Sequence, residues 1–530
     1  MQDEEACNLD GEWILAFIPR SIRGGRVAAV LRLAQAEKAE DDEDDDHKAD
    51  NVDDPVHCIS FCSESGQFPP AYSNLTHRNS GRTNMDQCAA CLNAQFCSMG
   101  IGADRKTRTI GNRNAWRRSL GRLWNRMMVL TSVKGQTDLP RYFAQVFGMA
   151  QSLENGRLDF VLDDGRTFRA EGRSPGPVAT IEVHNPDLFA RLIREGNLGL
   201  LEAYMDVWWT TPDLQGFMDL VHGRNDAVYD GFPAIGLVRA FEKLRHKLRG
   251  NSRRQARKNI AAHYDLGNEF YRIWLDETMT YSSALFHDGQ EPLEKAQQQK
   301  YQSMVDQMGA QPGDHVLEIG CGWGGFAEYA AAERGLRVTG LTISQAQHDY
   351  AVERIRAKGL QDRVEIKMQD YRDERGLYDG IASIEMFEAV GEKYWPTYFQ
   401  VVRDRLKPGR NATLQVITVQ DARFETYRKG VDFIQKHIFP GGMVPSPSML
   451  CDEVRRAGLQ VQHAIEFGDG YSQTLRRWHD SFNGRWDEIS QLGFDDRFRR
   501  MWNLYLTSCA GAFEGGHCDV TQITITRPVA

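Results

Sequence analysis

The sequence predicts an α/β fold whose C-terminal half contains a mostly parallel, doubly wound sheet. From residue 311 onward, short runs rich in β-branched residues alternate with stretches of helical periodicity. This alternation is the pattern of βαβ units. A cluster of glycines also stands between the first such run and the helix that follows it, as in sheets that bind a nucleotide-like ligand at the end of a strand. A small α+β domain and a disordered extension are predicted to precede this half.

The overall composition argues against several classes of protein. The chain has 530 residues, of which 41% are hydrophobic and 26% charged, so we expect several globular domains. No apolar run approaches the roughly 18 residues of a membrane-spanning helix. The first residues lack the basic and apolar regions of a secretion signal, which predicts a cytoplasmic protein. The net charge of -9 argues against a nucleic-acid partner.

Residues 1–125 differ in character from the rest of the chain. An unbroken acidic run from Glu40 to Asp46 is followed by a polar stretch from Ser63 to Asn84. Such blocks stay solvated, so we predict a disordered extension, with an upstream extension of the gene model as the alternative. Five cysteines in this region have spacings that a zinc site could use, namely Cys58, Cys62, Cys88, Cys91 and Cys97. Because little apolar periodicity surrounds them, we favour reduced thiols and predict no metal site.

The next segment, residues 130–235, is predicted to form the small α+β domain. Alternating residues flank an Asp-Asp-Gly turn between Leu158 and Gly172, which predicts a hairpin. Residues 179–209 are predicted to form a strand and then two helices, with the break at Gly196 and Gly199.

A basic linker helix is predicted over residues 236–260. Seven Lys or Arg residues and no acidic residue occur between Arg245 and Lys258. A solvated helix face is the ordinary meaning of such a run. The alternative is contact with anionic lipid headgroups, at about 1 kcal/mol for each basic residue near the surface.

Residues 261–530 are predicted to form the domain that contains the large sheet. Its predicted strands are residues 315–319, 337–343, 364–370, 378–386, 412–419, 460–467 and 519–527.

Glu318 lies at the end of the first strand, and Gly320, Gly322, Gly324 and Gly325 follow it. Glycines there allow a ligand to approach the backbone closely. The third glycine comes too early for a dinucleotide site, and no acid ends the second strand. The spacing instead resembles the first motif of class I S-adenosylmethionine methyltransferases, the alternative being a turn without a ligand.

Longer motifs extend this resemblance. They include HYDLGNEFYRIWLDETMTYSSALF, VLEIGCGWGGFAEYAA, GLTISQAQ, MFEAVGEKYW, FIQKHIFPGGMVPS and YLTSCAGAF. With them, residues 130–530 resemble the cyclopropane-fatty-acyl-phospholipid synthase family, which includes the mycolic acid cyclopropane synthases. The resemblance implies a class I methyltransferase fold, a lipid-docking role for the small domain and a homodimer. A membrane substrate without a spanning segment predicts a peripheral protein at the inner leaflet, with the basic stretch 245–258 as the expected lipid contact.

The resemblance also implies a reaction. S-Adenosylmethionine is expected to donate a one-carbon unit to the cis double bond of an unsaturated phospholipid acyl chain. A bound bicarbonate is expected to remove a proton, so that a cyclopropane ring closes. One alternative is a methyl- or methylene-branched chain, and a more remote one is a lipid-binding protein without catalytic activity.

The residues implied for this reaction fall into two groups. The family's cofactor positions match Tyr281, Ser282, Glu318, Gly320, Gly322, Gly324, Thr342, Ile343, Ser344, Gln347, Asp370 and Tyr371. Its anion and catalytic positions match Glu388, Tyr471, Ser283, Gln415, Ile417 and Cys509. For Cys509, the helical surroundings of small residues favour close packing over nucleophilic catalysis.

Two of these positions depart from the family pattern. Ser283 stands where many members have Cys, and Gln415 stands where they have His on the fifth strand. Both side chains can hydrogen-bond an anion. Neither titrates near pH 7, so a proton relay of the histidine type is lost. The departures therefore put the expected ring closure in question, whereas methyl transfer does not depend on them.

Overall fold

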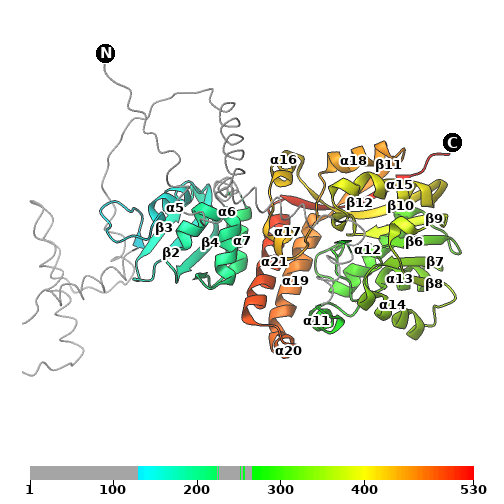
Figure 1. Ribbon diagram of the computed structural model, residues 1–530, viewed down its shortest axis with the longest axis horizontal. Helices are drawn as coiled ribbons and strands as arrows, with labels where there is room; N and C mark the ends of the chain where they lie inside the picture. The colour runs from blue at the N-terminus through cyan, green and yellow to red at the C-terminus, as the bar shows by residue number, and fades with distance from the viewer. Residues whose placement is uncertain (1–128, 224, 226–250, 252–254, 257–265, 530) are drawn as a thin grey trace, which may run out of the picture. The chain divides into compact units, whose positions relative to one another are not determined.

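The computed structural model describes residues 129–223, 225, 251, 255–256 and 266–529 (Figure 1). The predicted extension, its cysteines Cys58, Cys62, Cys88, Cys91 and Cys97, and most of the basic stretch 245–258 lie outside the described residues. No helix in the described part of the chain is long and apolar enough to cross a membrane.

A five-stranded sheet comes first in the described chain. Its strands are β1 (Val129–Leu130), β2 (Asn155–Val161), β3 (Thr167–Glu171), β4 (Ser174–Val183) and β5 (Trp209–Thr210), in the order β1-β3-β2-β4-β5. β2 and β3 form the predicted antiparallel hairpin, with Phe160 opposite Phe168. Both rings are buried and pack on Phe143 of helix α5 (Phe143–Ala150). Aromatic and β-branched residues on one face thus build the core of this sheet.

Helices α6 (Leu188–Met205) and α7 (Leu214–His222) also belong to this region. α6 is interrupted at Gly196, whose φ of 65° lies outside the helical range, as the sequence predicted. The predicted break at Gly199 is wrong, because Gly199 continues the helix. The Asp213 side chain caps α7 by accepting a hydrogen bond from the Gly216 N–H at 2.8 Å.

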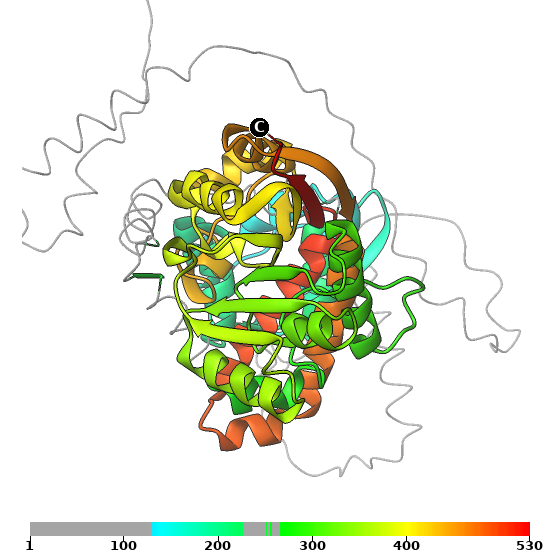
Figure 2. The same ribbon diagram turned by 90° about the vertical axis from the view of Figure 1, so that its right-hand side faces the viewer.

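The second sheet has seven strands, and it confirms the predicted mostly parallel α/β fold. The strands are β6 (His315–Ile319), β7 (Arg337–Thr342), β8 (Val364–Met368), β9 (Tyr378–Ile384), β10 (Leu406–Val419), β11 (Gln460–Glu466) and β12 (Cys518–Thr526). Their order is β11-β12-β10-β9-β6-β7-β8. The strands from β10 to β8 run parallel, whereas β12 is antiparallel to both β10 and β11. Figure 2 shows the twist across these strands.

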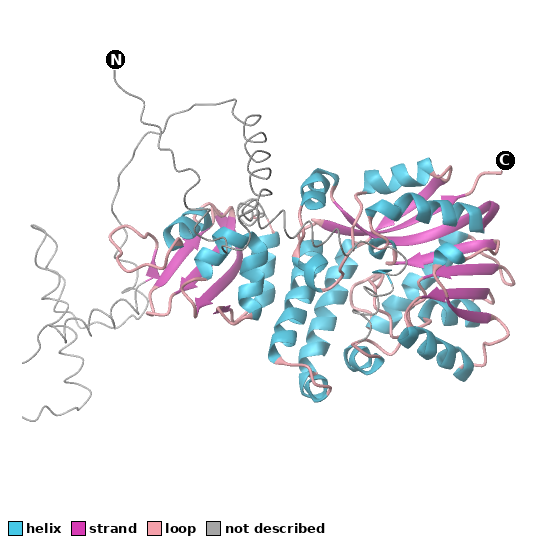
Figure 3. Cartoon of the chain, in the orientation of Figure 1, coloured by secondary structure: helices cyan, strands magenta, loops and turns pink. Residues whose placement is uncertain are grey.

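Helices cover both faces of this sheet (Figure 3). α12 (Leu293–Met308), α13 (Gly325–Ala332) and α14 (Gln345–Ala357) contribute to one core, together with Val316 and Val338 of the sheet. α15 (Trp395–Arg405) and α18 (Pro447–Arg456) contribute to the other, together with Leu317 and Leu341. Neighbouring residues of one strand therefore enter opposite cores, as expected of a sheet buried on both sides.

The remaining helices are α11 (Asn268–Trp274), α16 (Asp421–Lys429), α17 (Phe433–His437), α19 (Gly468–Gly484), α20 (Trp486–Gln491) and α21 (Asp496–Glu514). Short 3₁₀ turns are η2 (Tyr371–Asp373), η3 (Phe387–Ala389) and η4 (Glu392–Tyr394).

α21 packs closely against α7. A Cβ added at Gly511 of α21 would come within 3.2 Å of the Met218 backbone, so a side chain there would force the helices apart. The Arg476 guanidinium of α19 donates to the Asp219 carboxylate of α7 at 2.9 Å. The five-stranded sheet is thus joined through α7 to the helices that border the larger sheet.

Candidate active site

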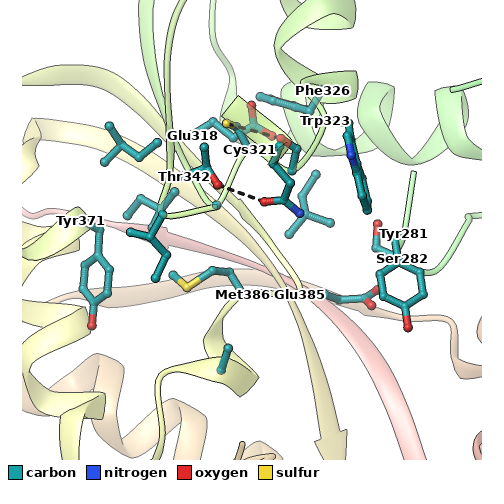
Figure 4. A pocket seen from close by; sticks show the side chains of 18 of the residues that line it. Tyr281, Ser282, Glu318, Cys321, Trp323, Phe326, Thr342, Tyr371, Glu385 and Met386 are labelled. Atoms are coloured by element: carbon teal, nitrogen blue, oxygen red, sulfur yellow. Dashed lines mark hydrogen bonds between the residues drawn. The ribbon is translucent and has the colours of Figure 1, made fainter. Parts of the chain in front are cut away.

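A cavity of about 170 Å³ opens at the carboxyl ends of β6, β7 and β9 (Figure 4). Ligands of open α/β sheets bind at this edge, where neighbouring crossovers run to opposite faces. Glycines of the loop after β6 form one wall of the cavity. The opposite side contains Tyr281, Ser282, Glu385 and Met386.

The loop after β6 requires glycine at its first position. Gly320 has a φ of 83°, and a Cβ there would lie 2.6 Å from the Met386 side chain. Gly322, one of the residues predicted to bind the cofactor, lines the cavity. Gly324 does not line it. Gly324 precedes α13 with a φ of 82° and faces Ala351 of α14, so it allows close helix packing.

Glu318 ends β6 and lines the cavity. Burial raises the pKa of this carboxyl to about 8, against the opposing effect of Arg354 and Lys300. Its Oε2 atom is buried and has no hydrogen-bond partner among the described residues. An acceptor in that state fits a ligand with a positively charged group, because the ligand would satisfy it. The amino-acid part of S-adenosylmethionine has such a group, so the site fits this cofactor.

Residues after β7 and β8 form the far end of the cavity. Thr342, Ile343 and Gln347 line it after β7, and the Thr342 hydroxyl donates to the Gln347 side chain at 3.0 Å. Ser344 is not among the lining residues. Its hydroxyl instead accepts from the Gln347 N–H at 3.3 Å and caps α14.

Asp370 and Tyr371 line the cavity after β8. The Asp370 carboxylate accepts two hydrogen bonds from the Arg372 guanidinium, at 2.8 and 2.6 Å. This ion pair fixes the loop against the cavity. All the predicted cofactor residues after β7 and β8 except Ser344 thus lie along one wall.

The predicted pair Tyr281 and Ser282 lines the cavity beside Glu385 (Figure 4). The Tyr281 hydroxyl donates to the Tyr505 hydroxyl of α21 at 2.7 Å. The Ser282 hydroxyl accepts from the Lys300 ammonium of α12 at 2.6 Å. Lys300 is fully buried, and this burial lowers its pKa to about 7.

Aromatic rings surround this part of the cavity. Tyr281 and Trp323 both line it. Tyr271 lies behind them, with its ring centroid 5.4 Å from that of Tyr281 and 5.0 Å from that of Trp323. Trp478 of α19 adds a further ring at 5.3 Å from Tyr281. Such faces are apolar and attract positive charge, so this wall can stabilise a cation.

The residues predicted to hold bicarbonate converge on Glu385. The Ser283 N–H and the Gln415 side-chain amide each donate to Glu385 Oε1 at 2.7 Å. The Tyr471 hydroxyl also hydrogen-bonds the Glu385 carboxylate. These contacts lie behind the cavity wall, since Ser283 and Gln415 are 0% and 1% exposed.

Glu388 and Ile417 lie next to this group. The Ile417 N–H donates to Glu388 Oε1 at 2.5 Å. Burial, together with the charge of Glu385, raises the pKa of Glu388 to about 8. Its Oε2 atom is buried and lacks a partner in the described part of the chain.

The predicted anion ligands therefore do not fit a bound bicarbonate, because the Ser283 N–H, the Gln415 amide and the Ile417 N–H all donate to carboxylates of the chain. Cys509, in α21, is also outside the cavity lining. Burial raises the pKa of its thiol well above the usual range, which disfavours the nucleophilic thiolate.

Comparison with known proteins identifies the family. Residues 251–523 match the family model described as mycolic acid cyclopropane synthetase. The chain belongs to this family. It is an S-adenosylmethionine-dependent methyltransferase that acts on lipids.

Members with different products are similar to it. The tuberculostearic acid methyltransferase of Mycobacterium tuberculosis is 39% identical over 381 residues, which cover 70% of this chain and 88% of the relative. The cyclopropane-fatty-acyl-phospholipid synthase of Escherichia coli is 37% identical over 357 residues, which cover 66% of this chain and 88% of the relative. A solved mycolic acid cyclopropane synthase, complexed with SAH and CTAB, is 29% identical with a TM-score of 0.49 and covers 51% of this chain and 98% of the other.

Sequence reasoning missed Glu385 and Lys300 at this site. The chain was expected to continue as a strand to Met386, whereas β9 ends at Ile384. Glu385 then adopts a φ of 46°, which turns the backbone away from the strand. The available signal was two acidic residues three positions apart, Glu385 and Glu388, at the end of a parallel strand. Lys300 gave no signal, because it lies within an ordinary polar helix sequence.

Proposed function

We propose that this protein transfers the methyl group of S-adenosylmethionine to the cis double bond of an unsaturated phospholipid acyl chain. The observation that carries the proposal is the composition of a single cavity. The glycine loop and Glu318 on one wall suit the cofactor, and aromatic rings with the half-buried Glu385 occupy the other. That combination suits attack by an uncharged alkene and removal of a proton afterwards.

Bound S-adenosylmethionine supplies an electrophilic methyl group. The residues of the chain orient the cofactor, stabilise the developing positive charge and supply a proton acceptor. Glu318 and the loop at Gly320 would orient the cofactor, which supports in-line attack. Tyr281 and Trp323 would face the positive charge that develops on the lipid. Their apolar surroundings exclude water, which would otherwise trap that charge as an alcohol.

The first candidate product is a cyclopropane acyl chain, and the 37% identity to a cyclopropane synthase supports it. A methyl- or methylene-branched chain is the second candidate. It is favoured by the departures at Ser283 and Gln415, because neither side chain titrates near pH 7 and the Gln415 amide donates to Glu385. The two outcomes share the methyl-transfer step and differ in which proton leaves.

Incubation with S-adenosylmethionine and vesicles of dioleoyl phospholipid tests the proposal. Mass spectrometry of the fatty acyl methyl esters should show a gain of one CH2 unit, with an equal amount of S-adenosylhomocysteine. Gas chromatography then separates ring from branch, because both can have the same mass. Consumption of neither substrate would contradict the proposed function, whereas cofactor binding without turnover would favour the non-catalytic lipid-binding alternative.

Access to the lipid requires contact with a membrane surface. We place this contact at the basic stretch 245–258, as expected from its charge. Asn251 and Ala256 of this stretch line the cavity, and the Asn251 side chain donates to the Gly441 carbonyl at 2.7 Å. The cavity wall and the proposed contact are therefore continuous in sequence. Sedimentation with vesicles should show stronger binding to anionic than to zwitterionic lipid, and equal binding would contradict this contact.

Three further expectations stay predictions. They are the division into residues 130–235, 236–260 and 261–530, the homodimer, and an inner-leaflet location. Light scattering of the purified protein tests the dimer directly.

A further inference from the structure

We propose that the Glu385 carboxylate takes the place of bicarbonate and is the base of the reaction. This inference rests on the proposed function and adds a catalytic residue to it. The first support is the convergence of donors already described. The Ser283 N–H, the Gln415 amide and the Tyr471 hydroxyl all point to one carboxylate that lines the cavity. A second anion would find these donors already in use.

The orientation of the Gln415 amide is fixed from behind. The Gln522 amide on β12 donates to Gln415 Oε1 at 3.0 Å. Gln522 Oε1 in turn accepts from the Ser303 hydroxyl and the Gln307 amide of α12, both at 2.7 Å. With its oxygen used as an acceptor, Gln415 presents its NH2 group to Glu385. This series of hydrogen-bonded amides orients the Gln415 side chain so that its NH2 group can bind a carboxylate.

The backbone at Glu385 supports the same assignment. Its φ of 46° lies in the left-handed region, which residues other than glycine seldom adopt. The Glu385 N–H donates to the Gln415 carbonyl at 2.8 Å, while the Gln415 side chain donates back to the carboxylate. This reciprocal pair holds a strained residue in place. Strain that persists at a cavity wall is typical of functional residues.

The surrounding charges suit a proton acceptor. Burial raises the pKa of Glu385, and the Lys300 ammonium acts in the opposite direction. Because the carboxylate is partly exposed to the cavity, it can reach the lipid, whereas Lys300 is fully buried behind Ser282. Lys300 is therefore a positioning residue that favours the charged form of Glu385.

The proposed reaction conserves atoms and electrons. The π electrons of the alkene form the new carbon–carbon bond as the sulfur–methyl bond breaks, and the other alkene carbon becomes positive. Glu385 then accepts one proton from the lipid. The electron pair of that C–H bond closes the ring or forms a new double bond. The products are the modified chain, S-adenosylhomocysteine and protonated Glu385.

The variant Glu385→Gly tests this proposal, because glycine accepts the left-handed backbone and the change opens the anion position. In buffer stripped of CO2, wild-type turnover should be unaffected by added bicarbonate. Glu385→Gly should lose about 100-fold in turnover, the usual size of a general-base contribution. Sodium formate or bicarbonate should restore part of it. Val207→Gly is the matched control, since exposed Val207 also has a positive φ, of 59°, and lies outside the cavity lining.

Titration calorimetry adds a measurement that does not depend on turnover. Glu385→Gly should bind formate saturably, whereas wild type and Val207→Gly should not. A wild type that binds bicarbonate or requires it for turnover would overturn the proposal, as would full activity of Glu385→Gly without added anion. Absence of lipid methylation by wild type under every condition would instead refute the proposed function, and the calorimetry would still decide whether Glu385 fills the anion position.

Discussion

The two walls of the cavity are built in different ways. The cofactor wall comes largely from two short stretches, residues 318–322 and 341–347, with Asp370 and Tyr371 close behind in sequence. The wall that bears Glu385 depends on residues from β9, β10, α12 and α19, including Gln415, Lys300 and Tyr471. A binding wall can thus be encoded by a local motif, whereas the acid–base wall exists only after distant segments have packed together. Variants that alter one wall, or the buried carboxyl behind it, separate cofactor binding from acid–base chemistry.

Gly320→Ala should have the largest effect on the cofactor wall. The added methyl would lie 2.6 Å from the Met386 side chain, on a backbone with a φ of 83°. Displacing the loop should weaken binding of S-adenosylhomocysteine and lower turnover by about 100-fold, the usual cost of misplacing reacting groups. Gly313→Ala is the matched control, because its φ of 92° brings the same strain while nothing lies within 4 Å. Equal losses of turnover in the two variants would show that backbone strain, and not the contact with Met386, causes the effect.

Lys300→Met should lower turnover more than it weakens cofactor binding, because Lys300 acts on Glu385 and reaches the cofactor wall only through the Ser282 hydroxyl and the charge at Glu318. Removal of the ammonium raises the pKa of Glu385, since Lys300 lowers it. We expect turnover to fall about 10-fold at pH 7 and the acidic limb of the pH–rate profile to move to higher pH, because a base must be deprotonated to act. An unshifted limb with reduced turnover would indicate a purely structural role. Thermal unfolding of the variant serves as the control for folding.

Glu318→Gln should weaken S-adenosylmethionine binding by about fivefold, consistent with the loss of one charged contact of about 1 kcal/mol. The rate at saturating cofactor should stay close to that of the wild type, because Glu318 lies on the cofactor wall. Equilibrium binding and turnover, measured separately, check this. A large fall in the saturated rate with unchanged affinity would contradict the division between the two walls.

Glu388→Gln should give the smallest change, an increase in stability that depends on pH. The pKa of Glu388 is raised to about 8 in the folded protein from its usual value of 4.5. Its protonated form is therefore favoured by folding, and this contribution is full below pH 4.5 and lost as pH rises through about 8. The uncharged variant should be more stable than wild type by at least about 1 kcal/mol at pH 9 and no more stable at pH 4. Denaturant unfolding at both values measures it.

The sequence predicted most of the large sheet because its strands have regular local patterns. β6 was predicted with its observed bounds, and β7 within one residue. β10 begins at Leu406, earlier than the predicted residue 412, through a Lys-Pro-Gly-Arg stretch without strand propensity. Leu406 pairs with Tyr378 of β9 and regular pairing resumes at Asn411, so this stretch is an irregularity within the strand that local propensity does not reveal.

The cofactor wall was predictable for the same reason, since a strand, a glycine loop and a helix specify one another locally. Glu385 was not, because its importance arises from a backbone turn that no nearby glycine or proline signals. Its partners Ser283, Gln415 and Tyr471 were all singled out, but as ligands of an external anion. A pattern of donors indicates that something negative is bound and does not reveal whether the chain itself supplies it.

The hydrogen bond between Tyr281 and Tyr505 has a mechanical consequence. Tyr505 lies in the same continuous helix, α21, as Gly511, where α7 packs closely. A shift of α7 would displace α21, and through one phenol pair this movement would reach the cavity beside Glu385. A displacement at the five-stranded sheet can in this way reach the cavity, although no residue of that sheet lines it.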